Sequence, residues 1–139
     1  SLVGSEMCIE TVVTGKTGPL LGAASSALLN ALKKLAGIDQ EIDLVSARAI
    51  EPIQTLKTNY LGSRNPRLHT DEILIALSSS AAENETAATA LRQLSKLKGC
   101  DMHSTVILSS VDTDTLKRLG MYLTCEPAYE QEDRKYHKL

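Results

Sequence analysis

Hydrogen-bonding side chains are concentrated in residues 65–72, which read Asn-Pro-Arg-Leu-His-Thr-Asp-Glu. Arg67 could bind a carboxylate or phosphate through two parallel hydrogen bonds, and His69 could transfer a proton near neutral pH. Asp71 or Glu72 could orient the imidazole of His69. Loops that enter helices are where α/β proteins commonly place such groups, so this segment predicts a binding or catalytic site. Its candidate ligand-binding residues are Asn65, Arg67, Thr70 and Asp71.

Helix capping is a simpler interpretation of part of the same segment. Thr70 could be an N-cap, with Asp71 and Glu72 in the first turn, where negative charge complements the helix dipole. Capping requires neither Arg67 nor His69, which favours a functional role for these two residues.

A glycine-rich turn, Gly15-Lys16-Thr17-Gly18, follows an apolar segment and precedes a helical pattern. A nucleotide-binding phosphate loop would need a glycine five positions before Gly15, where Glu10 stands. Lys16 and Thr17, with the free N–H groups at the helix start, could still bind one phosphate or carboxylate. A tight turn that needs glycine for its backbone shape explains the pattern equally well.

His103 and Ser104 begin a segment that reads as a buried strand. A histidine there is more often a structural residue, but His103 could join His69 as a proton-transfer group if the chain returns beside residues 65–72. Ser104 is a candidate for ligand binding only. Neighbours on a strand point to opposite faces, and the Gly-x-Ser-x-Gly turn of a nucleophilic serine is absent.

Metal and cofactor motifs are absent from the sequence. Cys100 and His103 are three positions apart but straddle a turn and a strand start, and no Cys-x-x-Cys or His-Glu-x-x-His occurs. Residues 112–115, Asp-Thr-Asp-Thr, lack the glycine and glutamate of a calcium loop, so Asp112 is predicted to cap a helix. The sequence does not identify which cofactor, if any, the domain uses.

The first half of the chain predicts strands that alternate with helices. Residues 8–13 form a short apolar run with β-branched residues, typical of a strand. Residues 19–36 have helical spacing, with Pro19 in the first turn and Gly37 as the stop. Residues 41–45 predict a second strand, and Ser46 is predicted to cap the helix that follows. This order is typical of parallel strands joined by helical crossovers.

The second half predicts a helical hairpin, residues 70–81 and 84–97, followed by a central strand at 102–109. A short helix and a last strand at 121–125 complete the pattern. The expected fold is a three-layer α/β/α sandwich with a mostly parallel sheet of about four strands. The hairpin is expected between strands two and three.

Composition limits the classes of protein to which the chain can belong. Its 139 residues make one domain, predicted at 8–128, with a linker or cloning remnant at 1–7 and a charged, frayed tail at 129–139. Acidic residues number 17 and basic residues 15, and Phe and Trp are absent, so nucleic acid is not an expected partner. No apolar run approaches the ~20 residues that cross a membrane. Three scattered cysteines favour a cytoplasmic setting.

Several segments in unbroken order resemble the C-terminal part of the domain-of-unknown-function 1846 family, also called uncharacterised protein family 0371. The segments are Thr14-Gly-Lys-Thr, Leu21-Gly-Ala-Ala-Ser-Ser-Ala-Leu-Leu-Asn-Ala, Ile50-Glu-Pro-Ile, Leu61-Gly, Asn65-Pro-Arg-Leu-His-Thr-Asp-Glu, Gly99-Cys, His103-Ser-Thr-Val-Ile-Leu-Ser and Leu123-Thr-Cys-Glu-Pro. The resemblance implies a three-layer α/β subdomain of a longer bacterial protein, with an N-terminal portion as its partner. No established activity, cofactor or catalytic residue comes with it.

Two functions follow as expectations. In the first, the domain binds a small anionic molecule bearing phosphate or carboxylate, through Lys16, Thr17, Arg67 and helix N-termini, with His69 or His103 transferring a proton. In the second, it is a structural or oligomerisation module. Small-residue surfaces would then pack against the N-terminal portion or another copy, and their alanines are Ala23, Ala24, Ala27, Ala87, Ala88 and Ala90.

Overall fold

The computed structural model describes residues 4–125 and contains one four-stranded sheet with the order β2-β1-β3-β4. The strands are β1 (Ser5–Cys8), β2 (Val12–Gly15), β3 (Asp101–Ser104) and β4 (Tyr122–Cys125). Strand β1 is antiparallel to both β2 and β3, whereas β3 and β4 are parallel. The fold is therefore α/β with a mixed sheet, and the expectation of a mostly parallel sheet is wrong.

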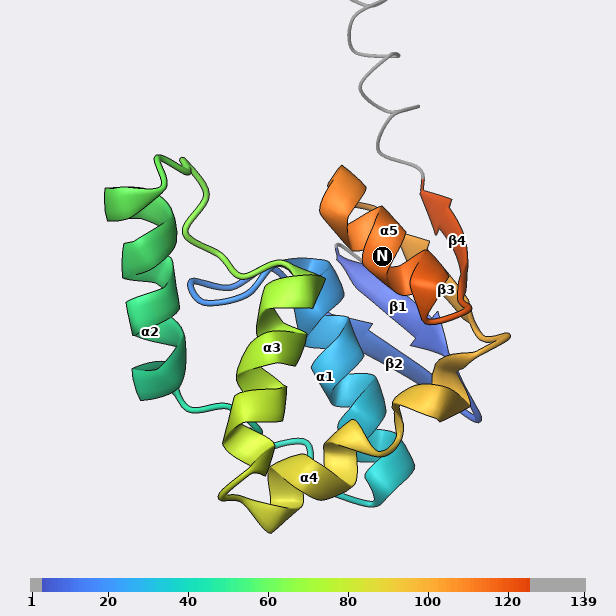
Figure 1. The fold of residues 1–139 in the computed structure, drawn as a ribbon. Helices are drawn as coiled ribbons and strands as arrows, with labels where there is room; N and C mark the ends of the chain where they lie inside the picture. Colours follow the sequence, from blue (N-terminus) through green and yellow to red (C-terminus); the bar gives the residue numbers. More distant parts are fainter. Residues whose placement is uncertain (1–3, 126–139) are drawn as a thin grey trace, which may run out of the picture.

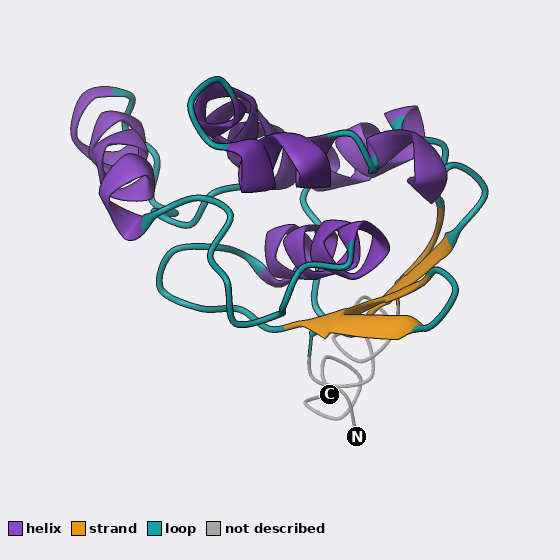
Figure 2. Cartoon of the chain, turned by 90° about the horizontal axis from the view of Figure 1, so that it is seen from below, coloured by secondary structure: helices purple, strands orange, loops and turns teal. Residues whose placement is uncertain are grey.

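The described helices cover one face of the sheet (Figures 1 and 2). In chain order they are α1 (Ala23–Ala36), α2 (Ala47–Thr55), the π-helical turn η1 (Leu56–Tyr60), α3 (Thr70–Ala81), α4 (Glu85–Leu91), the 3₁₀ turn η2 (Leu94–Leu97) and α5 (Ser110–Arg118). Helix α1 packs on β1 and β2, and α3 and α4 form the expected hairpin. Helices α1 and α5 contact the strands, whereas α3 and α4 pack on α1. Among residues 4–125 no helix covers the other face of the sheet, so the expected α/β/α sandwich is not confirmed.

Strand alternation separates a packed face from an outer face. Met7 of β1 and Met102 of β3 are paired in register and fully buried under the helices. Their strand neighbours Glu6 and His103, also paired, point to the other side. The sheet thus buries an apolar face and leaves a largely polar face without helices.

Two predictions at the N-terminal end differ from the structure. The segment predicted as one strand, 8–13, includes the end of β1, the hairpin turn at 9–11 and the start of β2. This turn lacks the usual Gly, Pro, Asn or Asp of a hairpin loop, so the sequence hides it. Residues 5–7, assigned to the linker at 1–7, lie in β1, a central strand of polar Ser and Glu with a single apolar Met.

Residues 41–45 form no strand in the structure. The buried Lys33 of α1 donates from Nζ to the carbonyl oxygens of Gln40 at 2.7 Å and Ile42 at 3.0 Å. Burial lowers the pKa of Lys33, opposed by the nearby Asp43 and Asp39. A lysine therefore supplies the hydrogen bonds that a neighbouring strand would have supplied.

Other boundaries shift as well. Helix α1 begins at Ala23, so Pro19 lies in the preceding loop and not in the first helical turn. The predicted strand 102–109 is β3, which ends at Ser104, and the helix predicted over 84–97 divides into α4 and η2. No described helix is both long and apolar enough to cross a membrane. Residues 1–3 and the predicted tail at 129–139 lie outside the described residues.

Candidate functional site

A cavity of about 220 Å³ lies where the N-termini of three helices meet. Its lining includes the N-cap residues of all three: Gly22 of α1, His69 of α3 and Ser109 of α5. Backbone N–H groups at a helix start are unpaired within the helix and carry partial positive charge. Three such ends around one space favour a negatively charged group there.

The N-terminus of α1 is the one left open. No side chain caps it, and its first turn has no acidic residue. Ala23 and Ala24 line the cavity, and their backbone N–H groups have no hydrogen-bond partner among the described residues. By contrast, the hydroxyl of Ser109 accepts from the Asp112 amide at 3.0 Å at the start of α5. An acceptor supplied from outside would complete the first turn of α1.

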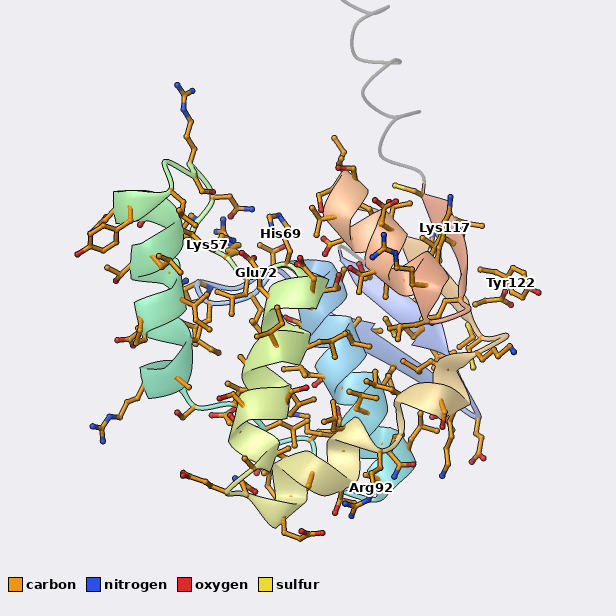
Figure 3. The ribbon with its side chains drawn as sticks, viewed as in Figure 1. Lys57, His69, Glu72, Arg92, Lys117 and Tyr122 are labelled. Carbon is orange, nitrogen blue, oxygen red and sulfur yellow. The ribbon has the colours of Figure 1, made fainter. Side chains whose placement is uncertain are left out.

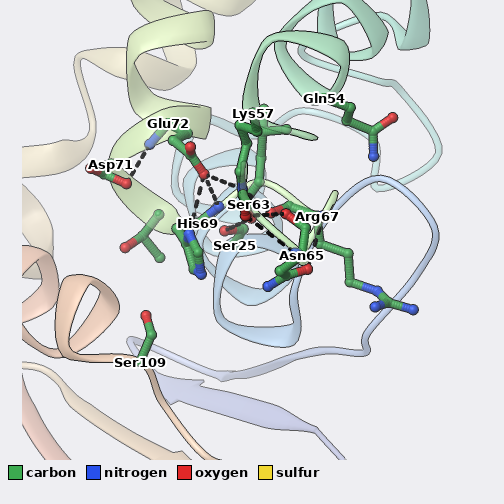
Figure 4. A network of polar contacts seen from close by, with 12 residues as sticks. Ser25, Gln54, Lys57, Ser63, Asn65, Arg67, His69, Asp71, Glu72 and Ser109 are labelled. Atoms are coloured by element: carbon green, nitrogen blue, oxygen red, sulfur yellow. Dashed lines mark hydrogen bonds and ion pairs between the residues drawn. The ribbon is translucent and has the colours of Figure 1, made fainter. Parts of the chain in front are cut away.

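Four of the predicted site residues line this cavity: Thr17, Asn65, Arg67 and His69. Arg67 donates from Nε to the carbonyl of Gly18 at 2.7 Å, while its backbone N–H donates to Asn65 Oδ1 at 3.0 Å. Figure 4 shows Asn65 and His69 on the side of the cavity opposite Ser109, with the end of Arg67 extending away from His69. Folding thus gathers residues from two predicted segments, the glycine-rich turn and residues 65–72.

A partly buried ion pair between Lys57 and Glu72 contacts His69 (Figures 3 and 4). Lys57 of η1, only 6% exposed, donates to Glu72 Oε1 at 2.8 Å and also to the carbonyl of Arg67. The same Oε1 accepts from the His69 backbone N–H at 2.8 Å and lies 3.2 Å from His69 Nδ1. Burial alone would raise the pKa of Glu72, but the hydrogen bonds and charge of Lys57, with the His69 contacts, lower it below its usual value.

Lys57 and Asp112 are the side chains around the candidate site whose contacts the sequence did not predict. Lys57 lies seven positions after the buried Ile50, so a charged residue on the apolar stripe of the helix was the available signal. Asp112 was predicted to cap its own helix, but Ser109 does so. The carboxylate of Asp112 instead accepts from the backbone N–H of Thr70 at 2.8 Å and from its hydroxyl at 2.7 Å. Asp112 thereby joins α5 to the start of α3.

Thr70 and Asp71 do not line the cavity. Thr70 is the first residue of α3 and not its N-cap, and both its donors are engaged by Asp112. The Asp71 carboxylate accepts from the Glu72 amide at 2.8 Å. The N-cap of α3 is His69, which forms a capping box with Glu72, so the expectations that Thr70 caps this helix and that capping does not need His69 are both wrong.

Lys16, His103 and Ser104 lie elsewhere. Lys16 lines a separate cavity of about 520 Å³ between α1, β2 and the loop before α2. His103 lies on the helix-free face of the sheet, where Nδ1 is 2.8 Å from Thr124 Oγ1. Ser104 is buried on the other face, with its hydroxyl 3.1 Å from that of Ser5. Because neighbours on a strand point to opposite faces, His103 and Ser104 lie on different faces of the sheet. Neither lines the cavity that His69 lines.

The chemistry available at the cavity is hydrogen bonding and proton transfer. Arg67 and the helix ends supply positive charge, His69 supplies a titratable ring, and Asp112 supplies a carboxylate already bound to Thr70. Within residues 4–125, no group of three or more His, Cys, Asp or Glu is placed to hold a metal ion.

Comparison with known proteins identifies the family. The family model described as "Domain of unknown function DUF1846, C-terminal" matches residues 2–135. UPF0371 proteins are 57% identical over 92% of the chain in Corynebacterium aurimucosum, 61% over 87% in Corynebacterium efficiens and 51% over 91% in Streptococcus sanguinis. The matches cover 26%, 24% and 26% of those proteins, so the chain spans about a quarter of their length. The chain therefore belongs to the DUF1846 (UPF0371) family and corresponds to its C-terminal domain.

Proposed function

We propose that this domain binds a small anion, a phosphate or carboxylate group, in the cavity between the N-termini of α1, α3 and α5. The observation that carries the proposal is the uncapped N-terminus of α1, whose free N–H groups face a space also lined by Arg67 and His69. Helix N-termini bind anions because their amide groups and dipoles both favour negative charge.

The volume of the cavity limits the ligand. At about 220 Å³, it is smaller than the roughly 300–1,000 Å³ of pockets that enclose drug-sized molecules. It suits one phosphate or carboxylate group better than a whole nucleotide. Any larger part of the ligand would extend out of the cavity.

Acidic residues near the cavity do not prevent anion binding. The Asp112 carboxylate accepts two hydrogen bonds from Thr70, and Glu72 is paired with the ammonium of Lys57. The two Nη groups of Arg67 have no partner among the described residues, but they extend away from His69, so they would bind a part of the ligand that extends out of the cavity. The hydrogen-bond donors without partners thus outnumber the unpaired carboxylates, which favours an anion as the ligand.

Position 22 allows a direct test, because a side chain there can take the ligand's place. Gly22 has φ −70° and ψ 165°, which any residue adopts, and an added Cβ would meet nothing within 4 Å. In Gly22→Asp the new carboxylate should cap α1 and compete with the anion. The control Gly22→Ala also adds a Cβ, and so restricts the backbone in the same way, but it adds no acceptor.

Phosphate titration followed by amide NMR and melting temperature would measure the effect. We expect wild type and Gly22→Ala to show saturable shifts at the Ala23 and Ala24 amides and a rise in melting temperature. Gly22→Asp should show neither, while being at least as stable as Gly22→Ala without phosphate. Equal binding by Gly22→Asp, or no saturable response in wild type, would contradict the proposal.

The assembly function remains a second proposal, favoured by the greater length of the relatives. The alanine surfaces suggested for it do not suit the role, because Ala23, Ala24, Ala27, Ala87 and Ala90 are at most 3% exposed within the domain itself. Packing against an N-terminal portion would need another surface. Size-exclusion chromatography with light scattering, with and without the N-terminal portion, would detect such association.

A further inference from the structure

The ring of His69 faces two groups that make opposite demands on Nδ1. The Glu72 backbone N–H donates to the His69 side chain in a capping box at the start of α3, which favours an unprotonated Nδ1, whereas the Glu72 carboxylate, 3.2 Å from Nδ1, could only accept from a protonated one. The same N–H also donates to Asp71 Oδ1 at 2.8 Å, so it is shared between the two acceptors. A hydrogen bond to an ionised carboxylate is roughly twice as strong as one between neutral groups, so the carboxylate is the stronger influence on the state of Nδ1.

Glu72 is held in its ionised form by its surroundings. Its Oε1 accepts from the ammonium of Lys57 and the backbone N–H of His69, both at 2.8 Å. Lys57 is buried and also bound to the Arg67 carbonyl, so it cannot turn away to solvent without losing two partners. An ionised carboxylate is only an acceptor, and an unprotonated Nδ1 at 3.2 Å would place two lone pairs against each other.

We propose that Glu72, fixed by Lys57, is a positioning residue that keeps the proton of neutral His69 on Nδ1 and leaves Nε2 to meet the ligand. The ring arrangement itself does not depend on the anion, whereas the role of Nε2 rests on the proposed function. A carboxylate behind a histidine commonly fixes the ring and its tautomer in this way.

The proposal defines the kind of anion that the cavity prefers. When the ring is neutral, Nε2 accepts, so it binds a ligand that carries an O–H beside its negative charge, such as a singly protonated phosphate or a hydroxy acid. When the ring is protonated, Nε2 donates, so it binds a fully ionised oxygen. The other charged groups around this ring are Arg67 from the preceding loop, Lys57 from η1 and Asp112 from α5.

Nitrogen-15 NMR of the histidine rings without any anion tests the proposal directly, because the two ring nitrogens have different shifts in each tautomer. We expect neutral His69 to be predominantly Nδ1–H in wild type and to change to predominantly Nε2–H, the form preferred by free histidine, in Glu72→Ala. Glu72→Gln should restore Nδ1–H. Its amide oxygen is needed by Lys57 and the His69 N–H, so it takes the place of Oε1.

The exposed pair Glu85–Arg92 provides the control, since Glu85→Gln removes an equivalent charge far from the ring. It should leave the tautomer unchanged. An Nδ1–H ring that persists in folded Glu72→Ala would overturn the proposal. If Glu72→Ala does not fold, wild type and Glu72→Gln still test it, because an Nε2–H ring in either of them overturns the proposal. A phosphate titration of the same samples reports on anion binding separately, so failure of one proposal is distinguishable from failure of the other.

Discussion

Glu72 has the most demanding position of any residue around the cavity. One oxygen of its carboxylate serves the Lys57 ammonium, the His69 amide and the His69 ring. Its side chain is 24% exposed, so these groups substitute for much of its hydration. Removal of one partner from such a network generally costs more than the network contributes, because the remaining charge stays buried and unpaired.

The lowered pKa of Glu72 predicts how stability depends on pH. A carboxyl whose pKa is lower in the folded protein stabilises the fold above its unfolded pKa, about 4.3, and this contribution is lost as pH falls through the folded pKa. We therefore expect the difference in unfolding free energy between wild type and Glu72→Gln to be greatest above about pH 5 and to shrink on acidification. Urea denaturation at a series of pH values would measure it.

Glu85→Gln is again the matched control for this titration. Glu85 pairs with Arg92 on the surface, with side-chain exposures of 83% and 61%. Exposed pairs contribute about 0–1 kcal/mol, so this variant should differ little from wild type at any pH. A constant difference between wild type and Glu72→Gln across the whole range would contradict the assigned role of Glu72.

At the scale of elements, the glycine-rich turn is required for packing more than for backbone shape. Gly15 lies at the end of β2, directly under α1. A methyl group added there would overlap the backbone of Ala27 and would lie 2.7 Å from the carbonyl oxygen of Ala23. Gly15 is absent from the residues with positive φ, so close approach of a helix to a strand is the physical requirement.

Gly15→Ala is therefore expected to destabilise the domain by about 3 kcal/mol or more, because backbone atoms of α1 would have to move. Gly18→Ala in the same turn is the matched control: a Cβ there meets nothing within 4 Å, and its φ is not positive. It should change the unfolding free energy by less than about 1 kcal/mol. Urea denaturation of both variants would test this, and similar losses in the two would show that the turn, not the packing, needs glycine.

Helices were predictable from the sequence because their signals are local. Helix α3 lies where it was predicted, although its N-cap is His69 and not Thr70. Ser46 caps α2 as expected, accepting from the Ala49 amide, and Asn84 caps α4, accepting from the Ala87 amide. Strands were harder because their partners are distant. Residues 41–45 have strand composition, yet Lys33 binds the carbonyl of Ile42 and that of Gln40 just before the segment, and no local signal distinguishes a lysine partner from a strand partner.

The candidate site was predictable in part for the same reason. Arg67 and His69 were identifiable from residue type on one loop, and both line the cavity. Whether Lys16 or Thr17 also lines this cavity depends on the direction of the glycine-rich turn, which tertiary packing decides. In the structure Thr17 lines it, whereas Lys16 lines the separate cavity beside β2. Asp112 was attributed to its own helix because the bond to Thr70 spans 42 residues.

At the scale of the whole molecule, the sheet is closed by segments from the two ends of the described chain. Strand β1 lies between β2 and β3, and β3 and β4 come nearly a hundred residues later. The buried Met7 packs beside Met102, and the Ser5 and Ser104 hydroxyls are 3.1 Å apart. The helices pack on this sheet through α1 and α5.

Removal of residues 1–8 should therefore abolish cooperative folding, although most of the deleted residues are polar or small. Without β1, β2 loses its one partner in the described sheet, β3 gains an open edge, and the core under α1 is exposed where Met7 was. Domains of this size have only about 5–15 kcal/mol of stability, so a loss on this scale is not tolerated. We expect the shortened chain to show poorly dispersed amide NMR spectra and no sigmoidal thermal transition by circular dichroism. Glu6→Gln, which changes β1 only on the helix-free face, should keep both, and a shortened chain that melts like wild type would show that β1 is dispensable to the fold.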